Sequence, residues 1–143
     1  MLVSVKDQLH QPHIAELLEY SVFTDEKLEA VIERYKTDER WVLLGYSEED
    51  QIIGVIGYEM AAPAILQIHH LAVDPQYRGL GYGRGMILEL IEKVRPVKVK
   101  AEVDEEAADF FRNIGFEIIS LGEKYPYSEK FECSFLTDFT PNI

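Results

Sequence analysis

The sequence contains a single cysteine, Cys133, among its 143 residues. One cysteine excludes an internal disulfide and any zinc site built from several cysteines. No apolar run reaches the roughly 18 residues that a membrane-spanning helix needs, and residues 1–11 lack the basic start and apolar stretch of a signal peptide. We therefore expect a cytoplasmic protein that binds no metal.

Basic residues are also scarce, because 14 Lys and Arg stand against 26 Asp and Glu, giving a net charge of −12. Such a chain repels nucleic acid and anionic membrane surfaces unless its basic residues gather in one segment. Residues 75–101 do carry six basic and two acidic residues. We expect no nucleic-acid partner and no membrane partner, and one basic segment in an acidic protein.

The order of the expected elements indicates an α+β protein with a mixed sheet, formed as a single domain over residues 1–143. Apolar spacing predicts helices over residues 12–20, from Thr24 onward, and over 83–94 and 104–113. Strands are predicted over residues 1–6, 41–46, 51–60, 65–73, 97–103, 116–121 and 130–136. This order favours one central, mostly antiparallel sheet with helices on its faces and a parallel crossover.

Alternating glycines follow the strand that ends at Val73. The segment from Asp74 reads Asp-Pro-Gln-Tyr-Arg-Gly-Leu-Gly-Tyr-Gly-Arg and leads into a helix. Glycines let backbone N–H groups converge, and a helix start adds positive potential, so this turn suits a phosphate group. Arg78 and Arg84 add positive charge. A glycine turn without a ligand is the alternative, but glycines at a helix start cost stability.

Two nucleotide motifs do not fit this turn. A P-loop requires Gly-Lys-Ser/Thr at its end, whereas Gly83 is followed by Arg84. A dinucleotide fingerprint beginning at Gly79 requires a small residue where Arg84 stands. Neither class of nucleotide-binding protein is therefore favoured.

The turn resembles the pyrophosphate loop of the GNAT superfamily, the acyl-CoA-dependent N-acyltransferases, whose motif is Gln/Arg-x-x-Gly-x-Gly/Ala. Arg78 to Gly83 match this motif. The preceding residues 71–75 resemble the family's splayed fourth strand, and residues 107–117 resemble its second signature. The resemblance covers nearly the whole chain, although residues 1–40 match only in pattern.

This resemblance implies the GNAT fold, with six to seven strands and about four helices, and acetyl-CoA as the acyl donor. It implies that pantetheine lies in a V between the strand ending at Val73 and the strand from residue 97, paired like an added strand with backbone groups. The implied coenzyme-binding residues are Leu71, Ala72, Val73, Arg78, Gly79, Leu80, Gly81, Tyr82, Gly83, Arg84 and Phe111.

The same strand offers candidate catalytic groups. Side chains alternate across a strand, so Gln67 and His69 share one face while His70 faces the other. In the family, a base or a residue that orients a base water often stands at the positions of Gln67 and His69. We predict His69 as the base, since imidazole titrates near neutral pH, although a half-buried structural histidine is the alternative. We expect His70 to be a core residue.

The proton donor for the coenzyme thiolate is less defined. Many family members carry a tyrosine at the position of Phe111, and phenylalanine has no exchangeable proton. Tyr125, Tyr127 or water are the remaining candidates. Asp104 also replaces a common asparagine that contacts the coenzyme, which puts that contact in doubt. Cys133 alternates with aromatic residues on the last strand and is expected in the core.

The acceptor is predicted only by class. Acidic residues on the first two helices favour a cationic amine, although a solvated acidic surface is the alternative. We expect an N-acetyltransferase that acts on a small-molecule or peptide amine by direct transfer in a ternary complex. The rival interpretation is a non-catalytic acyl-CoA sensor, and the last strands could pair in a homodimer.

Overall fold

The computed structural model describes residues 1–21, 27–125 and 128–139. The elements in chain order are β1 (Leu2–Ser4), η1 (Lys6–Gln8), α1 (Pro12–Tyr20), α2 (Leu28–Thr37), β2 (Val42–Glu48), β3 (Gln51–Ala62), β4 (Ile65–Val73), η2 (Pro75–Tyr77), α3 (Tyr82–Val94), β5 (Lys98–Val103), α4 (Glu105–Asn113), β6 (Glu117–Tyr125) and β7 (Ser128–Leu136). The predicted helix start at Thr24 lies outside the described residues.

The strands form one sheet in the order β1-β2-β3-β4-β5-β7-β6. β4 and β5 pair in parallel, whereas β1–β2, β2–β3, β5–β7 and β6–β7 are antiparallel. The seven strands and the four α-helices of the described residues confirm the predicted α+β fold with a mostly antiparallel mixed sheet. Among the strands, β6 departs most from its predicted bounds, because it continues to Tyr125, and it pairs with β7 as a long hairpin.

Contacts along the chain divide it into two compact units. The first unit comprises Met1–Glu59 and His69–Val94, and the second comprises Met60–Ile68 and Arg95–Ile143. β3 and β4 contribute residues to both units. The single domain expected from the sequence stays a prediction.

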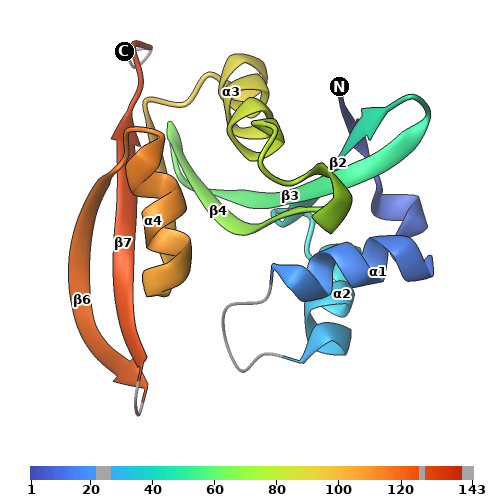
Figure 1. The fold of residues 1–143 in the computed structure, drawn as a ribbon, viewed down its shortest axis with the longest axis horizontal. Coiled ribbons are helices and arrows are strands. Elements are labelled where there is room, and N and C mark those ends of the chain that lie inside the picture. The colour runs from blue at the N-terminus through green and yellow to red at the C-terminus, as the bar shows by residue number, and fades with distance from the viewer. Residues whose placement is uncertain (22–26, 126–127, 140–143) are drawn as a thin grey trace. The chain divides into compact units, whose positions relative to one another are not determined.

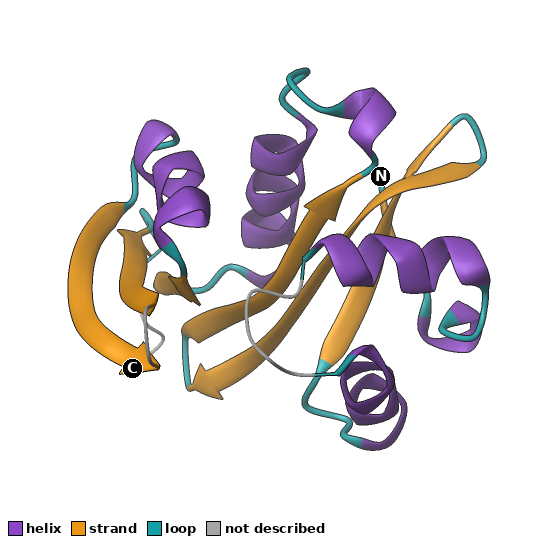
Figure 2. Ribbon diagram, turned by 60° about the horizontal axis from the view of Figure 1, so that its bottom comes forward, coloured by secondary structure: helices purple, strands orange, loops and turns teal. Residues whose placement is uncertain are grey.

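In the first unit, α1 and α2 cover one face of the sheet and α3 covers the other, as Figures 1 and 2 show. α1 begins with Pro12, whose fixed φ suits a first helical turn, and it buries Ile14, Leu17 and Leu18 at the predicted spacing. These side chains join one apolar cluster with residues of α2, β2 and β3. The amphipathic faces read from the sequence therefore form the core.

Two glycines of β3 let the helices approach the sheet. A Cβ added to Gly57 would lie 1.9 Å from the Tyr35 hydroxyl of α2, and one added to Gly54 would lie 3.0 Å from Met86 of α3. The strand glycines are therefore explained by close helix packing, and a register shift between β2 and β3 lies next to Gly54.

The second unit contains its own aromatic cluster. The ring of Phe111 on α4 lies 5.0 Å from that of Phe116, which in turn lies 5.5 Å from that of Phe135 on β7. Cys133, two residues before Phe135 on β7, is fully buried, and burial raises the pKa of its thiol to about 11. Cys133 is thus the core residue that the strand pattern predicts.

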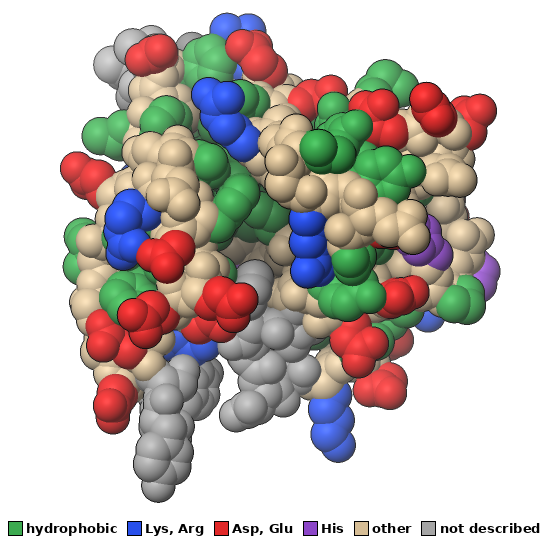
Figure 3. Space-filling model, viewed as in Figure 1, with side chains coloured by type: hydrophobic (Ala, Val, Ile, Leu, Met, Phe, Trp, Pro, Cys, Tyr) green, Lys and Arg blue, Asp and Glu red, His purple; other side chains and the backbone are tan. Residues whose placement is uncertain are grey.

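The surface carries the acidic character of the sequence. Figure 3 shows Asp and Glu side chains scattered over the viewed face, with Lys and Arg side chains standing mostly singly between them. The helices that the structure describes are all too short or too polar to cross a bilayer.

Candidate functional site

The turn after β4 is organised by Asp74. Its Oδ1 atom accepts a hydrogen bond from the Gln76 amide at 2.9 Å, and its carbonyl accepts one from the Tyr77 amide at 2.8 Å. Pro75 suits the first position of the short η2 helix, since it has no N–H to leave unpaired. This local capping fixes the direction in which the chain enters the glycine segment.

The glycines of the turn are open to solvent. Gly79 and Gly81 have φ values of +78° and +88°, which favour glycine. A Cβ at either position would meet no heavy atom within 4 Å. Within the described part of the chain, no backbone amide of residues 79–84 donates a hydrogen bond to a residue outside α3. The turn therefore combines unpaired N–H groups, free space and a helix start, which together suit an anion.

Arg78 is turned back toward β4. Its Nε donates to the Val73 carbonyl at 3.1 Å, and its guanidinium carbon lies 5.2 Å from the centroid of the Tyr20 ring. Arg84 lies on the first turn of α3, and both arginines are exposed. Arg78 therefore links the turn to the end of the strand.

The side chains within and beside the glycine turn differ in exposure. Leu80 is 68% exposed, whereas Tyr82 is half-buried with its ring centroid 5.8 Å from that of Tyr46 and 6.0 Å from that of Tyr77. Gly83 is buried at the start of α3. The turn is therefore supported by tyrosines on one side while its glycine backbone stays accessible.

Burial along β4 alternates as the sequence predicts. Gln67, His69, Leu71 and Val73 are half-buried, and the residues between them are buried. Gln67 stands in the part of β4 that pairs with β5, opposite Lys100. Both ring systems of the histidine pair nevertheless reach the same indole, because the centroids of His69 and His70 lie 4.0 and 6.0 Å from that of Trp41. The expected divergence of the two histidines is therefore seen in their burial, although both rings lie near Trp41.

His69 has a carboxylate partner. Its Nε2 atom lies 2.8 Å from Oε1 of Glu59 on β3, and the two side chains are 22% and 20% exposed. The imidazole stacks on Trp41 with an angle of 11° between the planes, and the guanidinium carbon of Arg34 lies 3.8 Å from the centroid of the indole. His69 is therefore an accessible histidine that is held on its edge and on its face.

His70 is held in the core instead. It is 4% exposed, and its Nδ1 lies 2.5 Å from the Tyr35 hydroxyl. Burial, and to a lesser degree the neighbouring His69, lowers the pKa of His70 to about 4. His70 is therefore neutral near pH 7, and Nδ1 accepts the hydrogen bond when Nε2 carries the proton.

Other predicted residues lie in the second unit. Phe111 is 2% exposed within the aromatic cluster, and the Asp104 carboxylate caps α4 by accepting from the Ala107 amide at 2.9 Å. Tyr127 lies outside the described residues, and of Tyr125 only the backbone, at the end of β6, is described. Their catalytic or binding roles stay predictions.

Sequence reasoning missed Glu59 and Trp41. Glu59 is the one charged residue in the run of residues 52–60, whose other members are apolar, aromatic or glycine, and Trp41 is the single tryptophan of the chain. A lone acid in a buried strand needs a partner, so this pattern was a usable signal. The partner itself could not be read, because strand register between β3 and β4 is a tertiary property.

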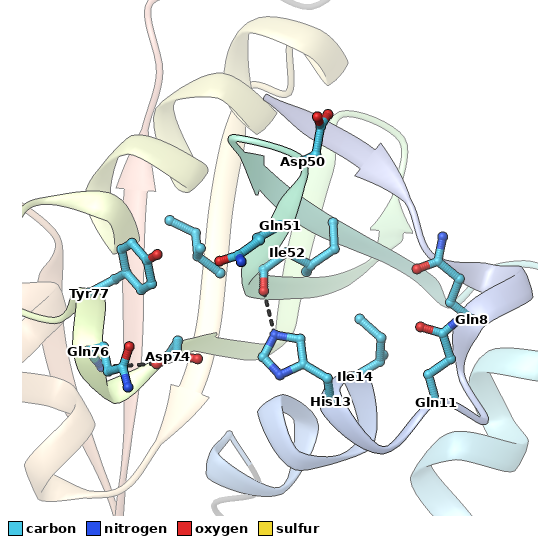
Figure 4. A pocket seen from close by; sticks show the side chains of 11 residues that line it. Gln8, Gln11, His13, Ile14, Asp50, Gln51, Ile52, Asp74, Gln76 and Tyr77 are labelled. Carbon is cyan, nitrogen blue, oxygen red and sulfur yellow. Dashed lines mark hydrogen bonds between the residues drawn. The ribbon is translucent and has the colours of Figure 1, made fainter.

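A pocket lies beside the glycine turn, within the first unit. It has a volume of about 410 Å³, and Figure 4 shows His13 at its centre, with Nε2 donating to the Ile52 carbonyl at 2.6 Å, and Gln76 and Tyr77 on the side of η2. Its other lining residues are Gln8, Gln11, Ile14, Asp50, Gln51, Ile53 and Asp74. Lysine and arginine are absent from this described lining, so the pocket does not share the anion-binding character of the glycine turn.

Comparisons with known proteins identify relatives of this chain. The chain is 36% identical over 64 residues to an uncharacterized N-acetyltransferase in the lysA 3' region of Bacillus methanolicus, covering 45% of this chain and 53% of the relative. It is 33% identical over 86 residues to the N-alpha-acetyltransferase RimI of Mycobacterium tuberculosis, covering 58% and 51%. The chain therefore spans about half the length of these two relatives.

Solved structures share the fold at low identity. The ribosomal-protein-S18-alanine N-acetyltransferase from Escherichia coli superposes with a TM-score of 0.77 at 14% identity, covering 99% of this chain and 96% of that one. A GNAT family acetyltransferase from Elizabethkingia anophelis with acetyl-CoA bound gives 0.74 at 15%, covering 96% and 97%. The profile of the acetyltransferase (GNAT) family matches residues 7–116, which include β4, the glycine turn and α3, and the chain belongs to that family.

Proposed function

We propose that this protein is an N-acetyltransferase that moves the acetyl group of acetyl-CoA to a primary amine by direct transfer in a ternary complex. The observation that carries the proposal is the open glycine turn at residues 79–84, which follows the strand that bears His69 after the short η2 helix. Val73 lies four residues after His69, about 13 Å along an extended strand. This spacing suits a ligand whose diphosphate and reactive group are joined by an extended arm.

The chemistry assigns a separate task to each part. Amide groups of the turn bind the diphosphate, backbone groups of Leu71 to Val73 align the arm, and His69 accepts a proton from the amine. The amine nitrogen forms the C–N bond as the C–S bond breaks, and the electron pair leaves on sulfur. The thiolate then takes a proton from water or from Tyr125 or Tyr127.

The acceptor is proposed as a small-molecule or peptide amine. The structural neighbour from Escherichia coli is named for an alanine of a ribosomal protein, and the relative from Mycobacterium tuberculosis is an N-alpha-acetyltransferase. These names support a peptide amino terminus as one acceptor class. The acidic side chains of α1 and α2, such as Glu16, Glu19 and Glu29, support a cationic amine as the other.

Calorimetry with acetyl-CoA tests the binding step. We expect heat of binding and an upward shift in Tm at millimolar acetyl-CoA, because a ligand that binds only the folded state stabilises it. Release of free coenzyme A thiol with spermidine, an aminoglycoside or an alanine-starting peptide then tests transfer. Absence of both heat and thermal shift would contradict the proposal.

A non-catalytic acyl-CoA sensor is the second candidate. It is supported by the buried Phe111, which stands where many family members carry an acidic tyrosine hydroxyl. Binding of acetyl-CoA without thiol release on every amine of the panel would favour this candidate over the enzyme. If the protein is a sensor, His69→Ala should leave both its affinity for acetyl-CoA and its sensing function unchanged.

A further inference from the structure

The hydrogen bond between Glu59 and His69 determines which imidazole nitrogen is basic. An ionised carboxylate can only accept hydrogen bonds, and a neutral imidazole carries its proton on one nitrogen. Since Oε1 of Glu59 lies 2.8 Å from Nε2, Nε2 carries the proton and donates it to the carboxylate. The lone pair of neutral His69 is therefore on Nδ1.

The Trp41 indole fixes the orientation of the same ring. Its plane lies within 11° of the imidazole plane with the centroids 4.0 Å apart, and the Arg34 guanidinium packs against the indole at 3.8 Å. Arg34 is itself anchored by Asp38, with Nε and Oδ2 separated by 3.9 Å. A flip of the imidazole about its Cβ–Cγ bond would break the bond to Glu59, so the indole and the carboxylate together select one orientation.

The environment of Trp41 favours the stacking of its ring face on His69 over hydrogen bonding by its N–H group. Trp41 is 6% exposed, yet its Nε1 is buried without a hydrogen-bond partner among the described residues. A buried donor left unpaired is uncommon in native proteins and costs stability. The indole is thus held where it stacks on His69 and not where its own polar group would be satisfied.

His70 is not available for proton transfer, because its ring is buried and its Nδ1 accepts a hydrogen bond from the Tyr35 hydroxyl. His69 is the histidine of β4 that combines exposure with a fixed tautomer. Building on the proposed acetyltransferase function, we propose that Glu59 is a positioning residue that holds His69 as the Nε2–H tautomer, so that Nδ1 takes the proton from the acceptor amine.

The proton transfer balances within the proposed reaction. Nδ1 gains the proton that the amine nitrogen loses as the C–N bond forms, while the C–S bond of acetyl-CoA breaks and its electron pair leaves with the sulfur. The resulting imidazolium donates Nε2–H to the Glu59 carboxylate, which stabilises the positive charge. Release of the Nδ1 proton to solvent restores the neutral ring, and Glu59 stays ionised throughout.

The first test reads the tautomer directly. Nitrogen-15 NMR of the full chain with labelled histidine, assigned by His69→Gln, should show His69 protonated on Nε2 when neutral. Glu59→Gln keeps an oxygen acceptor and should retain this tautomer, whereas Glu59→Ala should yield a mixture. An Nδ1–H tautomer in the wild-type chain, or an unchanged spectrum in Glu59→Ala, would overturn the inference.

Kinetics on an amine that the wild-type chain acetylates provide the second test. Glu59→Ala should lower kcat roughly tenfold to a hundredfold, the range found for carboxylates that orient metal-binding histidines, with little change in KM for acetyl-CoA. Glu59→Gln should recover part of this loss. Glu39→Gln, which alters an exposed carboxylate near Trp41, is the matched control and should keep wild-type rates.

The two proposals fail in different ways. A wild-type chain that neither binds nor consumes acetyl-CoA would overturn the proposed function and this inference with it. A wild-type chain that acetylates an amine at the same rate as a folded Glu59→Ala variant would overturn only the role of Glu59. Thermal unfolding of each variant identifies the folded ones, and Glu59→Gln provides the comparison where Glu59→Ala does not fold.

Discussion

The two faces of β4 place adjacent histidines in opposite situations. His69 is partly exposed, donates to a carboxylate and stacks on an indole, whereas His70 is 4% exposed and accepts from a tyrosine. Both rings lie near Trp41, so their difference does not come from distance to one aromatic group. It comes from the partner of each nitrogen and from access to water, which leaves one imidazole available for proton transfer and the other fixed as neutral.

The largest expected effect is the acid sensitivity that His70 gives to folding. Its pKa is about 4 in the folded chain and 6.5 when unfolded, so the unfolded state binds more protons between these values. The stability contribution is complete above pH 6.5 and is lost as pH falls toward 4. The loss amounts to about 3 kcal/mol, at roughly 1.4 kcal/mol per pKa unit.

Urea unfolding of wild type and His70→Gln from pH 7 to pH 4 measures this effect. The variant should be less stable at pH 7, because glutamine does not reproduce the packing of the buried ring or its hydrogen bond to Tyr35, but the difference in stability should narrow as pH falls. His69→Gln is the control on the other face and should keep the steep wild-type slope. Parallel slopes for wild type and His70→Gln would show that His70 is not the buried neutral group described above.

His69→Ala should have the next largest effect, and this effect is on catalysis. Loss of a general base lowers kcat/KM by roughly 100-fold or more, which corresponds to about 2.7 kcal/mol of transition-state stabilisation. Steady-state kinetics on an identified amine measure this value, and thermal unfolding of the same variant separates it from the stability lost with the bond to Glu59 and the stacking on Trp41. Equal rates for His69→Ala and wild type would remove the distinction between the two faces.

The contrast between these faces was partly readable from the sequence. Successive side chains of a strand point to opposite faces, so a strand over residues 65–73 predicts the observed alternation of half-buried and buried residues. The same rule identifies His70 as a core residue. The glycine turn was equally local, because positive φ at Gly79 and Gly81 is a property of the residue type. Local rules therefore located the turn and the histidine.

The partners of the histidines were not readable. Glu59 stands ten residues before His69 across a hairpin, and Tyr35 reaches His70 from a helix packed over Gly57. These contacts depend on strand register and helix placement, which are set by tertiary packing. For the same reason, the aromatic cluster that buries Phe111 could not be seen from its signature sequence.

Gly57→Ala should have the third largest effect, a loss of unfolding free energy on the face of β4 that bears His70. The added Cβ would lie 1.9 Å from the Tyr35 hydroxyl, so α2 or the hydroxyl must move and the bond to His70 must lengthen. Overpacking of this kind costs about 1–3 kcal/mol. Gly85→Ala is the matched control, because its added Cβ meets nothing within 4 Å and its helical site should gain about 0.5–1 kcal/mol.

Unfolding free energies of both glycine variants measure the difference. Destabilisation of Gly57→Ala together with an unchanged or raised stability of Gly85→Ala would support close packing over β3. Tolerance of both substitutions would mean that Tyr35 does not need its present position above the strand, and that the His70 side is looser than its burial indicates.

The smallest expected effect isolates the Tyr35–His70 hydrogen bond itself. Tyr35→Phe removes the hydroxyl and leaves the buried Nδ1 of His70 without this donor, so unfolding free energy should fall by about 1–2 kcal/mol at pH 7. In a double-mutant cycle with His70→Gln, the coupling energy should be about 1 kcal/mol, since each substitution removes the same bond. Acetylation rates should change less than in His69→Ala, because the hydroxyl does not touch the base. A coupling energy near zero would show that burial alone, without the tyrosine, keeps His70 neutral in the core.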